Sequence, residues 1–277
     1  MTAVFVNGEL VCEQDAVVSA LDHGFLTGDG VFESVLVHRG APFALRRHLD
    51  RLERSASIIG LDLPPRAEIE KAVGLVVRAA GCSRAKVRIT VTGGPGPLSS
   101  ARGEAGPTLV VAIVELDELK AATGTSVNLV PWPRNERGAL AGSKTISYAE
   151  NVVALAHARA RGADEAIFAN LAENLCEGTG SNVFVVLGGR LLTPPLSSGC
   201  LAGVTRSLVL ELVPSTEERD IPVSCLDLVE EAFLTSTTRG VQPVDTMAGR
   251  RLASCPGPMS LAAGAAYEEL LEKDADP

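Results

Sequence analysis

The chain has 277 residues, of which 46% are hydrophobic and 21% are charged, a composition typical of a folded globular protein and not of a disordered one. Its formal net charge is −9, so the basic surface expected of a protein that binds nucleic acid or anionic membranes is missing. The first residues lack the basic flank and apolar core of a secretory signal, and no apolar run reaches the roughly 20 residues that span a bilayer. We therefore expect a cytoplasmic protein with neither nucleic-acid nor membrane partners.

Cysteine and histidine spacing excludes the common metal sites. The six cysteines show no CxxC pair, and in a chain of this size they are expected to be reduced thiols. The four histidines show no HExxH or similar spacing, so no metal is predicted.

The first part of the chain alternates predicted strands and helices. An Asn7-Gly8 turn between two short apolar runs predicts a β-hairpin. Further strands are predicted at 30–37, 86–92 and 108–114, and helices at 46–59 and 66–80. The run Gly-Gly-Pro-Gly-Pro at 93–97 predicts a loop.

The second part of the chain predicts a separate unit. Strands are expected near 127–131, 165–169, 182–187 and 232–236, and helices near 148–161, 203–213 and 258–272. The fold class is therefore α+β or α/β with two domains: a small N-terminal domain at 1–115, a connection at 116–130 and a large domain at 131–277. The chain contains no GxGxxG motif of a dinucleotide-binding fold.

Lys144 is the lysine whose surroundings suggest chemistry. It lies among small and weakly charged residues, where desolvation favours the neutral amine that a covalent nucleophile requires. An ordinary loop lysine is the alternative. The segment 138–145 also resembles a phosphate-binding P-loop, but Ser143 stands where that motif requires glycine, so a nucleoside triphosphatase is disfavoured.

Three other segments carry groups suited to a phosphorylated cofactor. Glu177 precedes a glycine-rich turn; it is either a solvated turn residue or the carboxylate that keeps the pyridine nitrogen of pyridoxal phosphate (PLP) protonated. Thr205 opens a predicted helix, where backbone amides and its hydroxyl suit a phosphate, although a plain N-cap would also explain it. Hydroxyls follow the strand near 232–236, at Ser236, Thr237 and Thr238.

In this order and spacing, the motifs resemble those of the class IV aminotransferase family (PLP fold type IV). The motifs are GDGVFE at 28–33, HLDRLERSA at 48–56, KTISYAENVVALAHARARGADEAIF at 144–168, EGTGSNVF at 177–184, GVTR at 203–206 and FLTSTTRGVQPV at 233–244. The family includes branched-chain and D-amino acid aminotransferases, (R)-amine transaminases and 4-amino-4-deoxychorismate lyases. The resemblance covers nearly the whole chain.

The resemblance implies a cofactor, a site and an assembly. Lys144 would form the Schiff base with PLP and act as the catalytic base, and Glu177 would face the pyridine nitrogen. The remaining cofactor-binding residues implied are Arg51, Tyr148, Val204, Thr205, Ser236 and Thr237. The family fold implies a small N-terminal domain, a larger barrel-like C-terminal domain, PLP between them, and a homodimer whose partner chain helps to wall a shared active site.

The substrate pocket departs from each family template. D-amino acid aminotransferases typically have tyrosine where Phe32 stands, and an arginine in the loop where Gly93-Gly94-Pro95 stands. The substrate carboxylate would then need a substitute cation, for which the candidates are Arg88, Arg102, Arg134 and Arg239. The hydroxyls at 236–238 match the D-amino acid enzymes, whereas lyases often carry asparagine near that strand end.

We therefore predict a transaminase that exchanges amino groups between D-amino acids or (R)-amines and 2-keto acids. The predicted substrate-binding residues are Phe32, Arg88, Thr238 and Arg239. The alternatives are a 4-amino-4-deoxychorismate lyase that releases pyruvate and 4-aminobenzoate, a branched-chain L-amino acid aminotransferase, and a binding module without catalysis.

Overall fold

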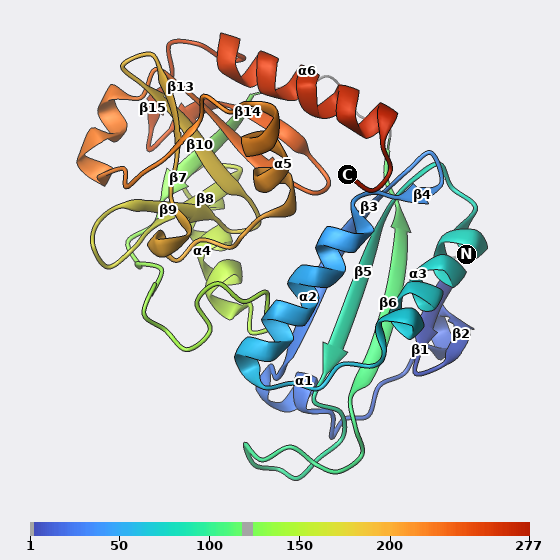
Figure 1. Ribbon diagram of the computed structural model, residues 1–277. Helices are drawn as coiled ribbons and strands as arrows, with labels where there is room; N and C mark the ends of the chain where they lie inside the picture. Colours follow the sequence, from blue (N-terminus) through green and yellow to red (C-terminus); the bar gives the residue numbers. More distant parts are fainter. Residues whose placement is uncertain (1–2, 118–123) are drawn as a thin grey trace. The chain divides into compact units, whose positions relative to one another are not determined.

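The computed structural model describes residues 3–117 and 124–277, which fold into two compact units, each built around its own sheet (Figure 1). The first unit comprises Met1–Glu118, Ser143–Tyr148 and Asp274–Pro277, and the second comprises Leu119–Gly142 and Ala149–Lys273. The division therefore places the segment around Lys144 with the N-terminal unit, which the sequence boundaries did not anticipate. Residues 118–123 of the predicted connection lie outside the described residues, and the predicted domain boundaries stay a prediction.

The first unit contains an antiparallel sheet with the strand order β2-β1-β6-β5-β3-β4. Its strands are β1 (Ala3–Val6), β2 (Glu9–Cys12), β3 (Gly30–His38), β4 (Ala41–Pro42), β5 (Arg84–Thr92) and β6 (Thr108–Glu115). The β1–β2 hairpin turns at Asn7 and Gly8, both with positive φ, as an Asn-Gly turn requires. In the β3–β5 pair, Phe32 lies opposite Thr90 and Ser34 lies opposite Arg88.

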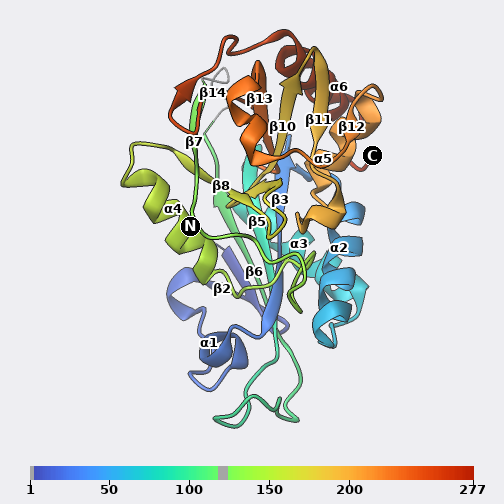
Figure 2. The same ribbon diagram turned by 90° about the vertical axis from the view of Figure 1, so that its left-hand side faces the viewer.

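Two helices cover one face of this sheet (Figures 1 and 2). They are α2 (Leu45–Ile59) and α3 (Arg66–Ala80); the short α1 (His23–Thr27) precedes β3, and a 3-10 turn lies at Glu13–Asp15. Alternate strand residues such as Val31, Val35 and Ile89 pack in the core with both helices. Because strand side chains alternate between faces, Phe32 and Arg88 lie on the opposite face of the sheet, away from this core.

The second unit contains a nine-stranded mixed sheet with the order β12-β11-β10-β13-β14-β7-β8-β9, and β15 pairs with β14. Its strands are β7 (Thr125–Leu129), β8 (Glu165–Ala169), β9 (Leu175–Gly178), β10 (Asn182–Leu187), β11 (Arg190–Thr193), β12 (Glu217–Glu218), β13 (Glu231–Ser236), β14 (Gly240–Met247) and β15 (Arg250–Arg251). Its helices are α4 (Ala149–Arg159), α5 (Val204–Leu212) and α6 (Pro258–Lys273), with 3-10 turns at Leu196–Ser198 and Val223–Leu228.

This second sheet curls on itself. β9 stands at one end of the strand order, yet it also packs against β10, near the other end. Apolar side chains from strands along the whole order, including Val127, Ile167, Val183 and Leu234, share one core inside the curl. The curl is the barrel-like character expected of the larger domain. None of the described helices is long and apolar enough to cross a membrane.

Candidate functional site

Backbone pairing fixes Lys144 at the edge of the first sheet. The amide of Phe32 donates to the carbonyl of Lys144 at 3.0 Å, and the amide of Ile146 donates to the carbonyl of Gly30 at 3.0 Å. The amide of Lys144 donates to Ser55 Oγ on α2 at 3.0 Å. The residues 144–146 therefore pair with the first residues of β3, and the lysine side chain leaves a backbone held on two sides.

The Lys144 amine lies over the Phe32 ring, which also contacts a second cation and a second aromatic ring. Nζ lies 4.3 Å from the centroid of the Phe32 ring, and the Arg88 guanidinium carbon lies 3.9 Å from the same centroid. The ring of Tyr148 meets the Phe32 ring edge to face at 5.5 Å. The structure thus brings four predicted site residues together: Phe32, Arg88, Lys144 and Tyr148. An aromatic face favours nearby cations, so Phe32 helps to place both of them.

Arg51 belongs to a buried cluster that sequence analysis missed. Its Nε and Nη2 each donate to Glu33 at 2.7 Å, and His48 Nδ1 lies 2.8 Å from Glu33 Oε2. All three residues are buried. A carboxylate can only accept, so Nδ1 of His48 carries the hydrogen. The bidentate pairing fixes the plane of the Arg51 guanidinium.

The electrostatics of this cluster are set by burial and pairing together. Burial by itself raises the pKa of the Glu33 carboxyl, but the attraction and hydrogen bonds of Arg51, joined by those of His48, hold that pKa well below its usual range. Burial lowers the pKa of His48 and outweighs the opposing effect of Glu33. At neutral pH the cluster therefore contains an ionised carboxylate, a neutral imidazole and a guanidinium. A sequence signal did exist, because Glu33 interrupts an otherwise apolar strand.

Glu177, in the second unit, is held in place and is not a solvated turn residue. Its side chain is only 14% exposed. The amide of Leu201 donates to Oε2 at 2.9 Å, and Oε1 lies 3.3 Å from Nε of Arg134 in an ion pair that leaves this Nε without a hydrogen bond. Arg134 also pairs with Glu150 at 3.0 Å and donates to Asn151 at 2.9 Å. The Leu201 amide and the Arg134 guanidinium therefore hold the Glu177 side chain in place, and both favour its ionised form.

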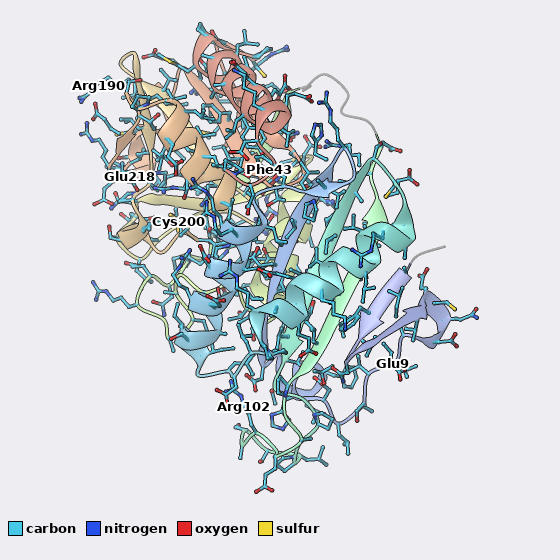
Figure 3. The ribbon with its side chains drawn as sticks, turned by 45° about the vertical axis from the view of Figure 1, so that its right-hand side comes forward. Glu9, Phe43, Arg102, Arg190, Cys200 and Glu218 are labelled. Carbon is cyan, nitrogen blue, oxygen red and sulfur yellow. The ribbon has the colours of Figure 1, made fainter. Side chains whose placement is uncertain are left out.

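The thiols beside Glu177 stay neutral. Burial raises the pKa of Cys200 (labelled in Figure 3) to about 11, and it also raises that of Cys176. Neither thiol is therefore a nucleophile near pH 7.

The start of α5 lacks a side-chain cap. The helix begins at Val204, and its N-cap is Gly203, which makes no side-chain hydrogen bond to the first turn. The alternative that Thr205 serves as N-cap is therefore wrong: Thr205 lies inside the first turn, where it is buried. A Cβ at position 203 would stand 2.0 Å from Asn182 Oδ1, so only glycine fits there. Uncapped amides at a helix start are suited to a phosphate.

The hydroxyls after β13 lie beside an engaged arginine. Arg239 Nε donates to Ser236 Oγ at 3.1 Å, and its Nη1 donates to Gln242 at 2.9 Å and pairs with Glu165 at 2.6 Å. Thr237 and Thr238 lie in the turn that follows Ser236. The sequence pattern had not indicated that a buried carboxylate would hold Arg239.

The four arginines considered for the substrate carboxylate differ in their partners. Arg102 (labelled in Figure 3) pairs through two 2.6 Å bonds with Asp29 and donates to the carbonyls of Ile59 and Gly60. Arg134 pairs with Glu177 and Glu150, and Arg239 pairs with Glu165. For Arg88, no carboxylate among the described residues lies within ion-pair distance, and burial lowers its pKa. Of the four arginines, Arg88 is therefore the one whose positive charge has no carboxylate partner among the described residues.

The structure leaves little room for a side chain at Gly93. A Cβ on Gly93 would lie 2.4 Å from Asp29 Oδ2, the same carboxylate that holds Arg102. A side chain at position 93 would therefore displace Asp29 and break its bidentate pair.

The groups present fit PLP. PLP carries an aldehyde, a phosphate and a basic ring nitrogen. The Lys144 amine suits the aldehyde, the Arg51 guanidinium and the uncapped start of α5 suit the phosphate, and the Glu177 carboxylate suits the ring nitrogen. The predicted residues in the first unit are Phe32, Arg51, Arg88, Lys144 and Tyr148, and those in the second unit are Glu177, Val204, Thr205, Ser236, Thr237, Thr238 and Arg239.

Comparisons with known proteins point the same way. The family model described as amino-transferase class IV matches residues 30–247. A putative branched-chain-amino-acid aminotransferase of Methanocaldococcus jannaschii is 34% identical over 254 residues, which covers 89% of this chain and 88% of that protein. A D-alanine aminotransferase of Staphylococcus epidermidis is 31% identical over 271 residues, 91% of each chain. The crystal structure of a branched-chain aminotransferase from Thermoproteus uzoniensis with norvaline superposes with a TM-score of 0.90 at 31% identity, covering 97% of this chain and 94% of that one.

Proposed function

From the premise that this chain belongs to the class IV aminotransferase family, and is therefore a PLP-dependent transaminase, we propose that it exchanges amino groups between D-amino acids or (R)-amines and 2-keto acids. The family, the fold type and the cofactor expected from the motifs are confirmed. The relatives include both D-alanine and branched-chain enzymes, so the substrate class rests on the residues of this chain. The observation that carries the proposal is Arg88, a half-buried guanidinium that lies over the same Phe32 ring as the Lys144 amine.

Lys144 is the proposed catalytic residue. PLP, when bound, supplies the aldehyde that receives the amino group and a ring that withdraws electrons from the substrate Cα. The Lys144 amine would hold the cofactor through its aldehyde and would serve as the base that takes the proton from the substrate Cα and returns it. The pairing of 144–146 with β3 supports this role, because the amine leaves from a fixed backbone.

Glu177 is proposed to hold the proton on the ring nitrogen. Its ion pair with Arg134 and its bond from the Leu201 amide favour the ionised carboxylate that this role requires. For the phosphate, we propose the Arg51 guanidinium, the amides and hydroxyl at Val204 and Thr205, and the hydroxyls of Ser236 and Thr237. Tyr148, which packs against Phe32, is proposed to contact the cofactor.

Arg88 is proposed to bind the substrate carboxylate, with Phe32 as the surface on which it rests. Burial without a carboxylate partner among the described residues leaves its charge to be neutralised by a ligand. The close approach of Asp29 to Gly93 supports the same assignment, because it leaves little room for a substrate-binding arginine at that position of the loop. Thr238 and Arg239 remain proposed contacts further along the substrate.

We also propose that the enzyme is a homodimer whose partner chain helps to line the pocket. Light scattering of the purified protein, which gives its mass in solution, would test this.

A branched-chain L-amino acid aminotransferase is the second candidate. It is favoured by the names of the Methanocaldococcus jannaschii and Thermoproteus uzoniensis proteins, each above 30% identity over most of this chain. The two candidates differ in the hand of the substrate, not in the roles of Lys144 and Glu177.

Single-turnover absorbance of the PLP-loaded enzyme tests the proposal. We expect the cofactor band to shift with D-alanine or (R)-1-phenylethylamine and to shift slowly with L-leucine. A rapid shift with L-leucine alone would establish the branched-chain candidate. Release of 4-aminobenzoate and pyruvate from aminodeoxychorismate, without amino-group transfer, would establish the lyase and refute the transaminase.

A further inference from the structure

Glu165 is a buried carboxylate to which the proposed chemistry gives no part. It is the first residue of β8, and its side chain is 6% exposed. Its Oε1 accepts from Ser181 Oγ at 2.6 Å, from the Gly180 amide at 3.2 Å and from Thr179 Oγ1 at 3.5 Å. Its Oε2 pairs with Arg239 at 2.6 Å. Donors from two separate turns therefore converge on this one carboxylate.

These two turns carry proposed cofactor residues. The first turn, 179–181, joins β9, which contains Glu177, to β10. The second turn, 237–239, joins β13, which ends at Ser236, to β14 and contains Thr237; Arg239 within it also donates to Ser236 Oγ. The packing is close, since a Cβ at Gly178 would lie 2.5 Å from Glu165 Oε1.

We infer that Glu165 is a positioning residue for PLP: its carboxylate holds the turn after Glu177 and the turn after Ser236 at a fixed separation within the second unit. The inference rests on the proposed function, because it takes Glu177, Ser236 and Thr237 as cofactor contacts. Glu165 itself touches neither substrate nor cofactor in this account. Its effect is on how tightly the cofactor binds.

The chemistry of the site explains why a carboxylate is needed. One oxygen accepts from the first turn and the other accepts from the second, and every partner is a donor. Glutamine has the same shape but only one acceptor oxygen, so its NH₂ group would face either the Arg239 guanidinium or the Gly180 amide donor to donor. Glu165→Gln therefore releases one turn while it keeps the volume of the side chain.

Glu231 provides a matched control in the same unit. It is also buried and also accepts two hydrogen bonds at the start of a helix, from the amides of Met259 at 3.2 Å and Ser260 at 2.5 Å. None of these partners is a proposed cofactor residue. Glu231→Gln thus removes a comparable buried carboxylate without touching either turn.

The test is a PLP titration of the cofactor-free proteins, with their melting temperatures measured with and without PLP. We expect Glu165→Gln to raise the Kd for PLP at least about tenfold, and to reduce the rise in melting temperature that PLP produces. Glu231→Gln should lower the melting temperature of the cofactor-free protein and leave the Kd within about twofold. If Glu165→Gln does not fold, Arg239→Gln, which releases the second turn alone, should raise the Kd in the same way.

Two outcomes separate this inference from its premise. If both glutamate variants bind PLP as tightly as the wild type while their cofactor-free melting temperatures fall, Glu165 is merely structural and the inference is overturned. If the wild-type protein itself fails to bind PLP, the proposed function is overturned instead.

Discussion

Replacing Arg88 by leucine should convert a preference for amino acids into a preference for simple amines. The guanidinium is half-buried and lies over the Phe32 ring at 3.9 Å, with no carboxylate among the described residues to neutralise it. A substrate carboxylate that met it would form a charge-assisted, bidentate pair. Leucine keeps much of the apolar volume against Phe32 and removes both bonds.

The magnitude follows from those two bonds. A hydrogen bond to a charged group contributes about 1.5–3 kcal/mol, so a pair contributes about 3–6 kcal/mol before solvent screening. Because Arg88 is only partly desolvated, we reduce this figure to about 2–4 kcal/mol. The corresponding fall in kcat/KM for D-alanine is on the order of 30- to 1,000-fold. For (R)-1-phenylethylamine, which lacks a carboxylate, we expect a change below about threefold.

Steady-state kinetics with both substrates provide the assay, and Arg102→Leu is the control. Arg102 is committed to Asp29 and to the end of α2, so its loss should leave the ratio of the two kcat/KM values unchanged. An equal fall for D-alanine and for the amine, or no fall for either, would refute the assignment of Arg88. The kcat/KM of Arg88→Lys for D-alanine should lie between those of the wild type and Arg88→Leu, because lysine keeps the positive charge but cannot form the bidentate pair.

The remaining predictions concern the buried cluster and the ring-nitrogen carboxylate. Glu33→Gln leaves the Arg51 cation buried without its bidentate partner and should lower the free energy of unfolding by about 3–5 kcal/mol in urea denaturation; a loss below about 1 kcal/mol would contradict the pairing. Folded His48 resists protonation, so the unfolded chain binds its proton first and stability should fall as the pH drops below about 6.5; His48→Gln should flatten the pH–stability curve there, and an unaltered slope would count against a neutral imidazole. Because the pKa of Glu33 is depressed, its own contribution should be complete above about pH 4.3 and should decline gradually as the pH falls below that value towards the lower pKa of the folded state. Glu177→Gln should lower kcat by at least about tenfold, and a normal rate in single-turnover measurements would exclude the ring-nitrogen role.

Local sequence signals predicted the elements well where the signals were strong. The Asn-Gly hairpin, the helical spacing of 46–59 and 66–80, and the β-branched run at 108–114 all correspond to observed elements. β14 was missed because Pro243 lies within it, and proline normally argues against a central strand. β9 and β11 are four residues each, too short for periodicity to be informative.

Most of the candidate site residues were identified by the order and spacing of the motifs, and fewer by the local physical environment of each residue. Lys144 was singled out by its small neighbours, but its pairing with the edge of β3 joins segments more than 110 residues apart, which no local pattern reveals. Arg51 was identified only by resemblance, and its partner Glu33 was overlooked because a charge in an apolar strand has no local explanation. Arg88 could not be chosen from four arginines until the partners of the other three were known.

Covalent trapping tests the central claim most directly. Borohydride treatment of the PLP-loaded protein would reduce the bond between cofactor and lysine, and peptide mass mapping would then locate the attached group. The account predicts a single modified lysine at Lys144, no modification in Lys144→Ala, and turnover by that variant reduced by at least about a thousandfold. A tag on any other lysine, or a Lys144→Ala enzyme that retains activity within about tenfold of wild type, would contradict it.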